Sequence, residues 1–451
     1  MAQNPAVLVI GAGIAGLAAA VKLGQAGVPV LVLEARDRIG GRILTTRDPR
    51  SDFPIELGAE FIHGIAPEIL QPLENAGVEI AEVEGTPWCV SKGQLRRCDF
   101  FSEVDAILER MDDSEPDESF LGFLQRCFPN PTNDRKMEEA KQGAIGYISG
   151  FNAADPDLVG VHWLVQGMRA EESIDGQRAF RCKKGYKVLI EVFEQEAASN
   201  GVTIRTGTII DRIHWKPGQA ELSAHDAQGA ATFSAPRVLI TLPLAILKAA
   251  VGQSGAVQFS PPLPRHKLDA LEKLEMGRVI RVVMRFRHRF WETISPPGEK
   301  KGTLSEMSFL FSQDELFPTW WTAVPMKWPI ITGWAPFHSA DALSGKGEPF
   351  VTQHALQRLS MLMKIDPRNL EDGLEAAYSH DWQSDPFSRG AYSYGKVGSD
   401  GAQQALASPV EKTLFFAGEA TDISGNNGTV HGAIASGYRA AQEILRLGAM
   451  T

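Results

Sequence analysis

The chain has 451 residues and a formal net charge of −10 at pH 7. This length allows two or three domains with a large buried core, and the acidic balance argues against nucleic-acid binding, which needs a basic surface. No run of about 18 apolar residues is available to span a membrane, and the first residues lack the pattern of a signal peptide, so we expect a cytoplasmic protein.

The first predicted elements are a buried strand and a helix joined by a glycine-rich turn. Val7–Ile10 is an unbroken apolar run, typical of a strand buried on both faces, and a helix is predicted over residues 17–23. The G-x-G-x-x-G turn between them suits a tight bend, close approach to a pyrophosphate and close helix packing, with free N–H groups at the helix start. The predicted dinucleotide contacts are Gly11, Gly13, Ile14, Ala15 and Gly16.

A second predicted strand, residues 28–33, ends at Glu34, where an acidic side chain holds the ribose hydroxyls of a dinucleotide. The following loop brings backbone and guanidinium groups to one pyrophosphate, because the planar fork of arginine binds phosphate oxygens in pairs. Residues 55–64 then predict a short strand that ends in a glycine-bounded turn.

The stretches LEARDRIGGR (33–42) and LGAEFIHG (57–64) resemble the second and third FAD-contacting stretches of the flavin-dependent amine oxidases. The resemblance implies FAD rather than NAD. It implies an α/β fold (α+β overall), with a Rossmann-like FAD-binding domain of the glutathione-reductase type and an interleaved substrate domain of mixed sheet plus helices. The cofactor contacts implied in these two stretches are Glu34, Ala35, Arg36, Gly41, Arg42, Gly58, Ala59 and Glu60.

The middle of the chain is mostly helical at first and then rich in strands. Helices are predicted over residues 100–111, 136–147, 186–199, 268–274 and 351–363, strands over 202–204, 207–213, 237–241 and 277–286, and turns or loops at 112–118, 129–131 and 295–298. The main chain at Ile210 would meet the adenine ring by the same resemblance. The expected domains are discontinuous, with residues 1–75, 195–260 and 395–451 binding FAD and residues 76–194 and 261–394 binding substrate.

Cysteine and histidine usage indicates neither a disulfide framework nor a metal site. The four cysteines show no C-x-x-C spacing and are expected to be reduced, scattered thiols, and the ten histidines lack ligand spacing. Four tryptophans between residues 320 and 334 favour a core cluster.

The C-terminal third carries W-x-x-D-P-x-x-x-G-x-Y over residues 382–392, FFAGEAT over 415–421 and TVHGA over 429–433. These motifs are very similar to the polyamine oxidase and lysine-specific histone demethylase branch, and closest to the polyamine oxidases. By this resemblance Tyr392 forms one wall of an aromatic cage, Trp382 lies beside the flavin ring, and Gly418 and Glu419 contact the ribityl chain. The Val430 N–H would face the pyrimidine carbonyl.

The sequence departs from relatives in this family at three positions. Thr429, a predicted cofactor and substrate contact, stands where monoamine oxidases place a second tyrosine, and Ala391 replaces the cysteine that bonds their flavin, so FAD should be non-covalent. Arg281 stands where the family usually has a lysine that holds a water against flavin N5. Because arginine is bulkier and presents a rigid fork, it either holds that water, fills its place or pairs with a nearby carboxylate.

We predict an FAD-dependent amine oxidase, with a polyamine or monoamine as its small-molecule substrate, that transfers a hydride equivalent from the carbon beside nitrogen to flavin N5. The imine formed would hydrolyse to an aldehyde and an amine. Glu60 either holds a cationic amine or serves the turn, and His63 either orients an amine or caps the turn. The acceptor is oxygen, with hydrogen peroxide formed, or another compound, because Arg281 predicts slow oxygen reactivity. We expect a monomer or homodimer without metal, membrane or nucleic-acid partners.

Other functions fit parts of the same pattern. An L-amino-acid oxidase would need an arginine aimed at the substrate carboxylate, for which Arg281 or Arg169 is available. An amine dehydrogenase would use a non-oxygen acceptor, and a non-catalytic flavoprotein would bind FAD without turnover. Histone demethylation is disfavoured because the sequence shows neither the long helical insertion nor the extra domain with which relatives engage chromatin.

Overall fold

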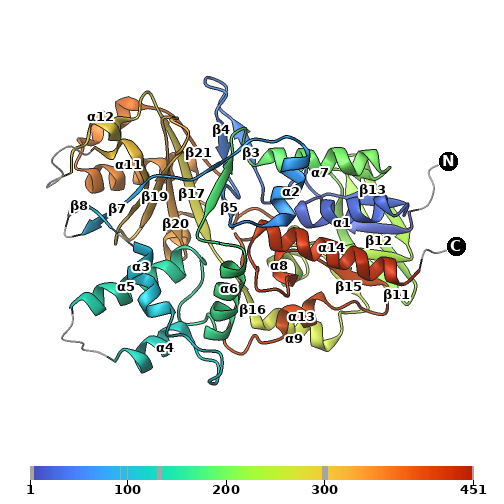
Figure 1. Cartoon of the computed structure of the whole chain (residues 1–451). Helices are drawn as coiled ribbons and strands as arrows, with labels where there is room; N and C mark the ends of the chain where they lie inside the picture. Colours follow the sequence, from blue (N-terminus) through green and yellow to red (C-terminus); the bar gives the residue numbers. More distant parts are fainter. Residues whose placement is uncertain (1–4, 92, 99, 130–134, 297–302, 449–451) are drawn as a thin grey trace.

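Two sheets at opposite ends of the molecule organise the chain (Figure 1). The structure is a computed structural model that describes residues 5–91, 93–98, 100–129, 135–296 and 303–448. Both described termini lie at the same end, beside the helices α1 (Ile14–Gln25) and α14 (Val430–Arg446).

The first sheet is parallel and has the strand order β10-β2-β1-β14-β23. Its strands are β1 (Val7–Ile10), β2 (Val30–Leu33), β10 (Thr203–Arg205), β14 (Arg237–Ile240) and β23 (Leu414–Phe416). Successive residues of β1 face opposite sides: Val7 and Val9 pack with α1, α14 and α7 (Lys187–Ser199), whereas Leu8 and Ile10 pack toward a second layer. Both faces are therefore covered, as the unbroken apolar sequence of β1 predicts.

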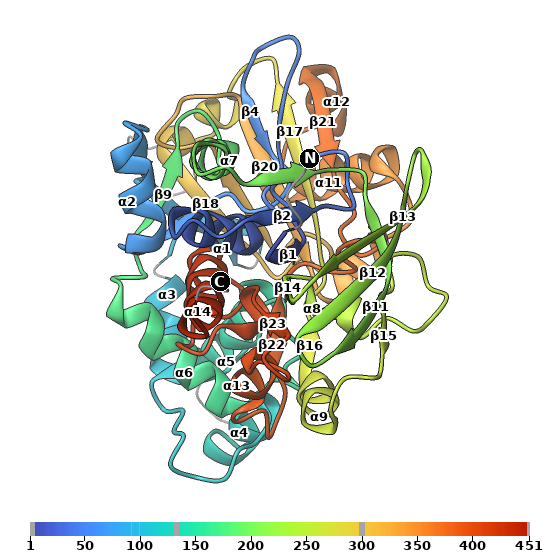
Figure 2. The ribbon, with the colours of Figure 1, turned by 90° about the vertical axis from the view of Figure 1, so that its right-hand side faces the viewer.

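That second layer is a four-stranded sheet with the order β13-β12-β11-β15, seen edge-on beside β14 in Figure 2. Its strands are β11 (Ile209–Lys216), β12 (Gln219–Asp226), β13 (Gly229–Ala235) and β15 (Gln258–Ser260). Ile213 and Leu222 are fully buried against Leu8 and Val238 of the parallel sheet. Two short helices follow, α8 (Leu244–Leu247) and α9 (Arg265–Lys273).

The other large sheet has seven strands in the order β21-β17-β20-β19-β18-β7-β8. They are β7 (Thr86–Ser91), β8 (Gln94–Arg97), β17 (Val279–Phe286), β18 (Met307–Phe311), β19 (Thr319–Thr322), β20 (Ile330–Pro336) and β21 (Leu374–Ser379). Alternate residues of β17, Ile280, Val282 and Met284, pack in one core with α10 (His338–Leu343) and α11 (Glu348–Met363). All eight residues of β17 are buried, so the strand that carries Arg281 is central.

A helical layer below this sheet completes the molecule (Figure 1). It contains α3 (Phe100–Leu108), α4 (Phe120–Cys127), α5 (Arg135–Gly150) and α6 (Val161–Ser173), which share a core around Phe120 and Phe123. The remaining elements are small: α2 (Pro67–Asn75), β3 (Thr45–Arg47), β4 (Pro54–Glu56), β5 (Ile62–His63), β6 (Ile80–Glu82), β9 (Ala179–Cys182), β16 (Leu274–Met276), η1 (Phe290–Thr293), η2 (Leu304–Glu306), α12 (Pro367–Gly373), β22 (Ser393–Gly395), α13 (Ala402–Ala407) and η3 (Glu419–Thr421).

The predicted helices and strands are present with shifted ends, and one prediction is wrong. Residues 55–64 form two short strands rather than one, because β4 pairs with β3 while β5 pairs with β9. The turn predicted at 129–131 and the loop at 295–298 lie partly outside the described residues. The two-domain limits stay a prediction.

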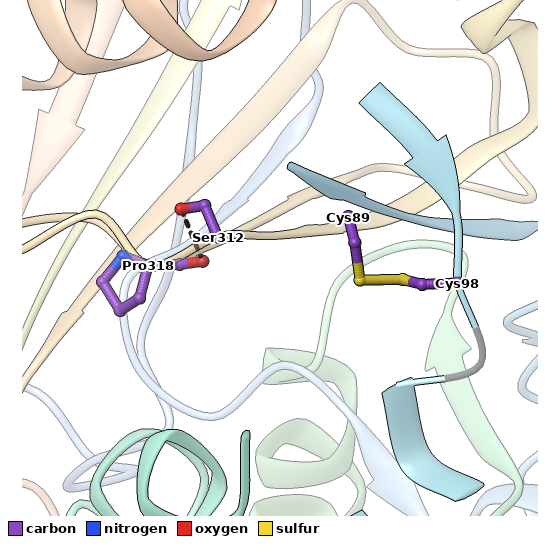
Figure 3. The surroundings of a disulfide bond; sticks show 4 residues. All are labelled: Cys89, Cys98, Ser312 and Pro318. Atoms are coloured by element: carbon purple, nitrogen blue, oxygen red, sulfur yellow. Dashed lines mark hydrogen bonds between the residues drawn. A yellow bond between two sulfur atoms is a disulfide. The ribbon is translucent and has the colours of Figure 1, made fainter. Parts of the chain in front are cut away.

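The expectation of four reduced thiols is also wrong. Cys89 on β7 and Cys98, just beyond β8, form a disulfide, with their Cα atoms 5.6 Å apart (Figure 3). The antiparallel β7–β8 pairing brings the two positions together, and a spacing of nine residues does not reveal that pairing. Cys127 is half-buried and Cys182 is buried, and both are free thiols.

Among the described residues, no helix combines the length and apolarity needed to cross a membrane. Within the same residues, no three histidine, cysteine, aspartate or glutamate side chains gather as a metal site.

Candidate functional site

The glycine-rich turn between β1 and α1 has the geometry that a dinucleotide requires. Gly11 has φ +103°, and a Cβ there would lie 2.6 Å from the Thr241 hydroxyl oxygen, while a Cβ on Gly16 would lie 2.0 Å from the Gly11 carbonyl oxygen. Gly13 caps α1 without a side-chain hydrogen bond, and beside it a Cβ on Gly41 would lie only 3.2 Å from the Gly13 Cα. The first turn of α1 thus faces backbone without side chains, which suits a pyrophosphate. The next residues in that turn, Ile14 and Ala15, are buried.

Glu34 lies buried at the carboxyl end of β2, beside this turn. Its carboxylate accepts hydrogen bonds from the Ala12 N–H at 2.8 Å and the Arg36 N–H at 2.9 Å. The two bonds hold the carboxylate at the edge where ribose hydroxyls are expected. Ile210, predicted to meet the adenine ring, is buried in the core that also contains Leu33.

Arg36 is engaged by protein groups rather than left open for a pyrophosphate. Its Nη2 donates to Asp385 at 2.7 Å and to the Ser388 hydroxyl at 2.9 Å. Burial opposes ionisation of Asp385, yet hydrogen bonds from His380 and Arg36 hold its pKa well below the usual range. The ion pair ties the loop after β2 to the W-x-x-D-P motif.

Arg42 and Glu419 connect three of the predicted cofactor motifs. The Arg42 Nη1 donates to the Ala391 carbonyl at 2.7 Å and to the Glu419 carboxylate at 3.0 Å. The other oxygen of Glu419 accepts from the Ser393 hydroxyl at 2.6 Å and the Gly428 N–H at 3.1 Å. The buried carboxylate therefore joins three segments, GGR (40–42), G-x-Y (390–392) and its own AGE (417–419).

Gly418 gives the AGE segment its bend, with φ +124°, and its N–H donates to the Ser436 hydroxyl at 2.9 Å. Further along the chain, α14 begins at Val430. There the Thr429 hydroxyl caps the helix by accepting from the Gly432 N–H at 3.0 Å, and it donates to the Asn426 carbonyl at 2.7 Å. Val430 is the first helical residue, so its N–H lies in the positive end of the helix dipole.

The residues Leu57–Ala59 are held by side chains from distant parts of the sequence. Trp382, itself buried, donates its indole N–H to the Leu57 carbonyl at 2.8 Å. Arg281 donates to the Gly58 carbonyl, and a Cβ on Gly58 would lie 1.9 Å from the Arg42 carbonyl oxygen. The Ala59 N–H donates to that same Arg42 oxygen at 3.1 Å. This segment thus lies between Arg42, Trp382 and Arg281.

Glu60, the next residue, is a buried carboxylate shared by two arginines. Arg281 from β17 and Arg181 from β9 each donate to it, and the Trp321 indole N–H lies 3.1 Å from its Oε2 atom. Burial alone would raise the pKa of Glu60, but the charges of Arg181 and Arg281 bring it below the ordinary value. Arg281 therefore pairs with a carboxylate, which is one of its three predicted fates, and Glu60 is not open to a cationic substrate.

Sequence reasoning missed Arg181 and Glu56, which belong to no motif. The Glu56 carboxyl accepts from the Tyr186 N–H at 2.7 Å and the Thr45 hydroxyl at 2.7 Å, and burial raises its pKa to about 7. Both residues line a small pocket together with Glu60. No local signal identifies them, because their positions depend on the pairing of β3 with β4 and of β5 with β9.

Aromatic rings gather around Phe61, the residue after Glu60. The Tyr392 hydroxyl donates to the Phe151 carbonyl at 2.6 Å, and His63 meets the Phe151 ring edge-on with centroids 5.5 Å apart. Burial lowers the pKa of His63 to about 4 and raises that of Tyr392, so both side chains are uncharged at neutral pH. Phe61 links this group to Trp321.

Arg169 lies apart from these rings and pairs with Asp113 through two hydrogen bonds, one of them 2.8 Å long. Its side chain is 63% exposed, which places it at the surface. Neither Arg169 nor Arg281 is thus a guanidinium left open for a substrate carboxylate.

Comparison with known proteins agrees with this geometry. The family described as flavin containing amine oxidoreductase matches residues 14–103 and 102–445. The chain is similar to polyamine oxidase 3 of Oryza sativa subsp. japonica, with 26% identity over 98% of this chain and 89% of that protein. It is also similar to lysine-specific histone demethylase 2 of Homo sapiens, with 28% identity over 98% of this chain but only 53% of the demethylase.

A solved structure of putrescine oxidase bound to putrescine has the same fold, with a TM-score of 0.79, 21% identity and coverage of 98% and 99% of the two chains. The resemblance to the flavin-dependent amine oxidases is thereby confirmed, as is the expected fold class. The chain belongs to the flavin-containing amine oxidoreductase family and is an enzyme that uses FAD.

Proposed function

We propose that the enzyme oxidises a C–N bond of an aliphatic di- or polyamine beside Tyr392, Phe151 and His63. The observation that carries this proposal is the group that the uncharged Tyr392 and His63 side chains form around Phe151. A polyamine oxidase among the relatives and a putrescine oxidase among the structural neighbours support the substrate class.

The residues proposed to contact FAD are those of the motifs described above. The bound FAD would be non-covalent, because Ala391 has no thiol with which to bond the flavin. The Glu34 carboxylate would bind ribose hydroxyls, and the bare turn at Gly13 and Gly41 would face the pyrophosphate. Glu419 would hold the ribityl chain through the network that it shares with Arg42. Bound FAD supplies the two-electron acceptor for the amine carbon.

The residues of this chain prepare the amine for oxidation. The rings of Tyr392 and Phe151 offer apolar surface to the amine, which favours the neutral amine over the ammonium ion. Neutral His63 accepts a hydrogen bond from the amine N–H and so orients its α-carbon. The amine loses a hydride equivalent and becomes an iminium ion, and added water then yields an aldehyde together with ammonia from a primary amine or a shorter amine from a secondary one.

The contacts of Arg281 bear on which electron acceptor reoxidises the flavin. The Arg281 guanidinium is tied by its two Nη atoms to the Gly58 carbonyl and to Glu60, and only its Nε–H is left without a partner among the residues that the structure describes. We propose that reoxidation by oxygen is slow and that another acceptor serves as well.

A product assay tests this function. The FAD-loaded protein is incubated in air with putrescine, spermidine, spermine, their N-acetyl derivatives, a benzylamine, L-amino acids and an N-methyl-lysine peptide. We expect aldehyde from the di- or polyamines, with an equimolar amount of ammonia or of a shorter amine according to whether a primary or a secondary nitrogen is oxidised. Products from the peptide alone would instead favour demethylation, which the demethylase relative keeps as a second candidate. Products from amino acids alone, or from none of these compounds, would contradict the proposal.

A further inference from the structure

The buried group Arg181–Glu60–Arg281 carries two positive charges and one negative charge. The side chains of Arg181, Glu60 and Arg281 are 8%, 7% and 4% exposed, so water screens them little. A single carboxylate shared by two buried guanidinium groups leaves a net charge of +1. Keeping an uncompensated charge away from water lowers folding stability, so we expect the charge to serve a function.

Below neutral pH, the surroundings that the structure describes neither screen that charge with water nor offset it with a second ionised acid. Arg181 lies over the Phe61 ring at 4.4 Å and Arg281 over the Trp321 ring at 5.2 Å, both apolar faces that exclude water. The other titratable groups beside the cluster are Glu56, with a pKa of about 7, and Cys182, whose pKa burial raises to about 12. Below neutral pH both are mostly protonated and uncharged, so the cluster keeps its positive charge.

The cluster adjoins the segment predicted to touch the flavin. Arg281 donates to the Gly58 carbonyl, and Trp382 donates to the Leu57 carbonyl one residue earlier. Arg181 does not reach this segment itself, since its other Nη atom donates to the Thr322 carbonyl at 3.0 Å. Within the described structure, Arg181 is therefore linked to this segment by contacts only through Glu60 and Arg281.

We propose that Arg181 is a positioning residue that, through Glu60, fixes Arg281 and keeps a net positive charge beside the flavin ring, which raises the reduction potential of the bound flavin. A preorganised positive charge stabilises the negative charge that reduction places on the ring. This inference rests on the proposed function for the placement of the ring against Gly58 and Trp382.

The test is the midpoint potential of the bound flavin, measured on the FAD-loaded protein at pH 6. In R181Q the cluster loses its net charge, and we expect about a tenfold lower ratio of reduced to oxidised flavin at a fixed solution potential, or about 30 mV for a two-electron couple. In E60Q the potential should rise. The double variant R181Q/E60Q restores the net charge and should return to the wild-type potential, as should R181K.

The matched control is R285Q. Arg285 is also a buried arginine on β17 and pairs with Asp48 and Glu375, and within the described part of the chain it has no hydrogen bond or ion pair to Glu60. Its replacement should leave the flavin potential unchanged. Potentials that shift in the same direction in R181Q and E60Q, or that shift equally in R285Q, would show a structural effect and overturn the inference.

Failure of this inference is distinguishable from failure of the proposed function. Unchanged potentials in a protein that still oxidises amines would remove the role of Arg181 alone. Shifted potentials in a protein that oxidises no amine would leave that role in place and remove the proposed substrate class. If R181Q does not fold, the comparison of E60Q, expected to raise the potential, with R181Q/E60Q, expected to return it to the wild-type value, still carries the test.

Discussion

Arg281 and Glu60 form a buried ion pair that joins β17 to the segment two residues before β5. The second hydrogen bond of Arg281 goes to the Gly58 carbonyl, so a single guanidinium spans two residues of the predicted flavin-contact segment. A lysine has one ammonium group and lacks the planar fork needed to bind both acceptors in this way.

Replacing Arg281 by lysine should therefore speed reoxidation by oxygen. In R281K the ammonium keeps the positive charge, but it frees space beside Gly58 in which a water can be held. We expect a several-fold faster return of flavin colour when the reduced protein is mixed with air-saturated buffer in a stopped-flow instrument. An unchanged reoxidation rate would contradict the role that we assign to Arg281, with R285K as the control for a general effect on β17.

Truncating Tyr392 should weaken amine oxidation much more than it weakens folding. Y392A removes a ring from the substrate space, and we expect kcat/KM for the best amine to fall by at least about tenfold, or about 1.4 kcal/mol. Y392F keeps the ring and loses only the hydrogen bond to the Phe151 carbonyl, which is worth about 1 kcal/mol. Y394F, at the neighbouring buried tyrosine, is the matched control and should leave kcat/KM unchanged.

Neutralising Glu419 should weaken FAD binding. E419Q keeps the size of the side chain, but its amide nitrogen cannot accept hydrogen bonds, so either Arg42 or the Ser393 and Gly428 donors lose a partner. We expect at least a tenfold higher dissociation constant for FAD, measured by flavin fluorescence on reconstitution of the apoprotein. E443Q, which changes a carboxylate on α14 that pairs with Arg439, should bind FAD as the wild type does; an equal loss in both variants would argue against a specific role for Glu419.

Glu56 should make folding stability fall as the pH rises. Its folded-state pKa of about 7 lies above the ordinary value of 4.5 because of burial, so the stabilisation is complete below pH 4.5 and is lost as the pH rises through about 7. Relative to E56Q, the wild-type free energy of unfolding should decline by roughly 3 kcal/mol over this range, at about 1.4 kcal/mol per pKa unit. Urea unfolding at several pH values measures the difference. E191Q, at a half-exposed carboxylate on α7, should follow the wild-type curve, and parallel curves for wild type and E56Q would refute the prediction.

Local patterns were enough to predict the parallel strands and the glycine turn. β1 is apolar throughout because both of its faces are covered, and Gly11 and Gly16 are glycines because a Cβ there would collide with backbone or with Thr241. The motif residues Arg42, Trp382 and Glu419 do lie together around the Leu57–Ala59 and AGE segments.

Contacts set by strand pairing were not predictable in the same way. Arg181 reaches Glu60 because β9 pairs with β5, an alignment between residues more than a hundred positions apart. The Cys89–Cys98 disulfide likewise depends on the β7–β8 hairpin, and no short sequence motif predicts the register of that hairpin. The single strand predicted over residues 55–64 failed because two neighbouring sheets each take one end of it.

The most direct test of the account is the visible absorbance of the bound flavin after anaerobic mixing with a stoichiometric amount of putrescine or spermidine. An amine oxidoreductase with the proposed substrate class predicts loss of the oxidised flavin bands with one equivalent of amine, before any acceptor is added. Flavin bands that persist with every amine, in a protein whose flavin dithionite still reduces, would contradict the proposed function.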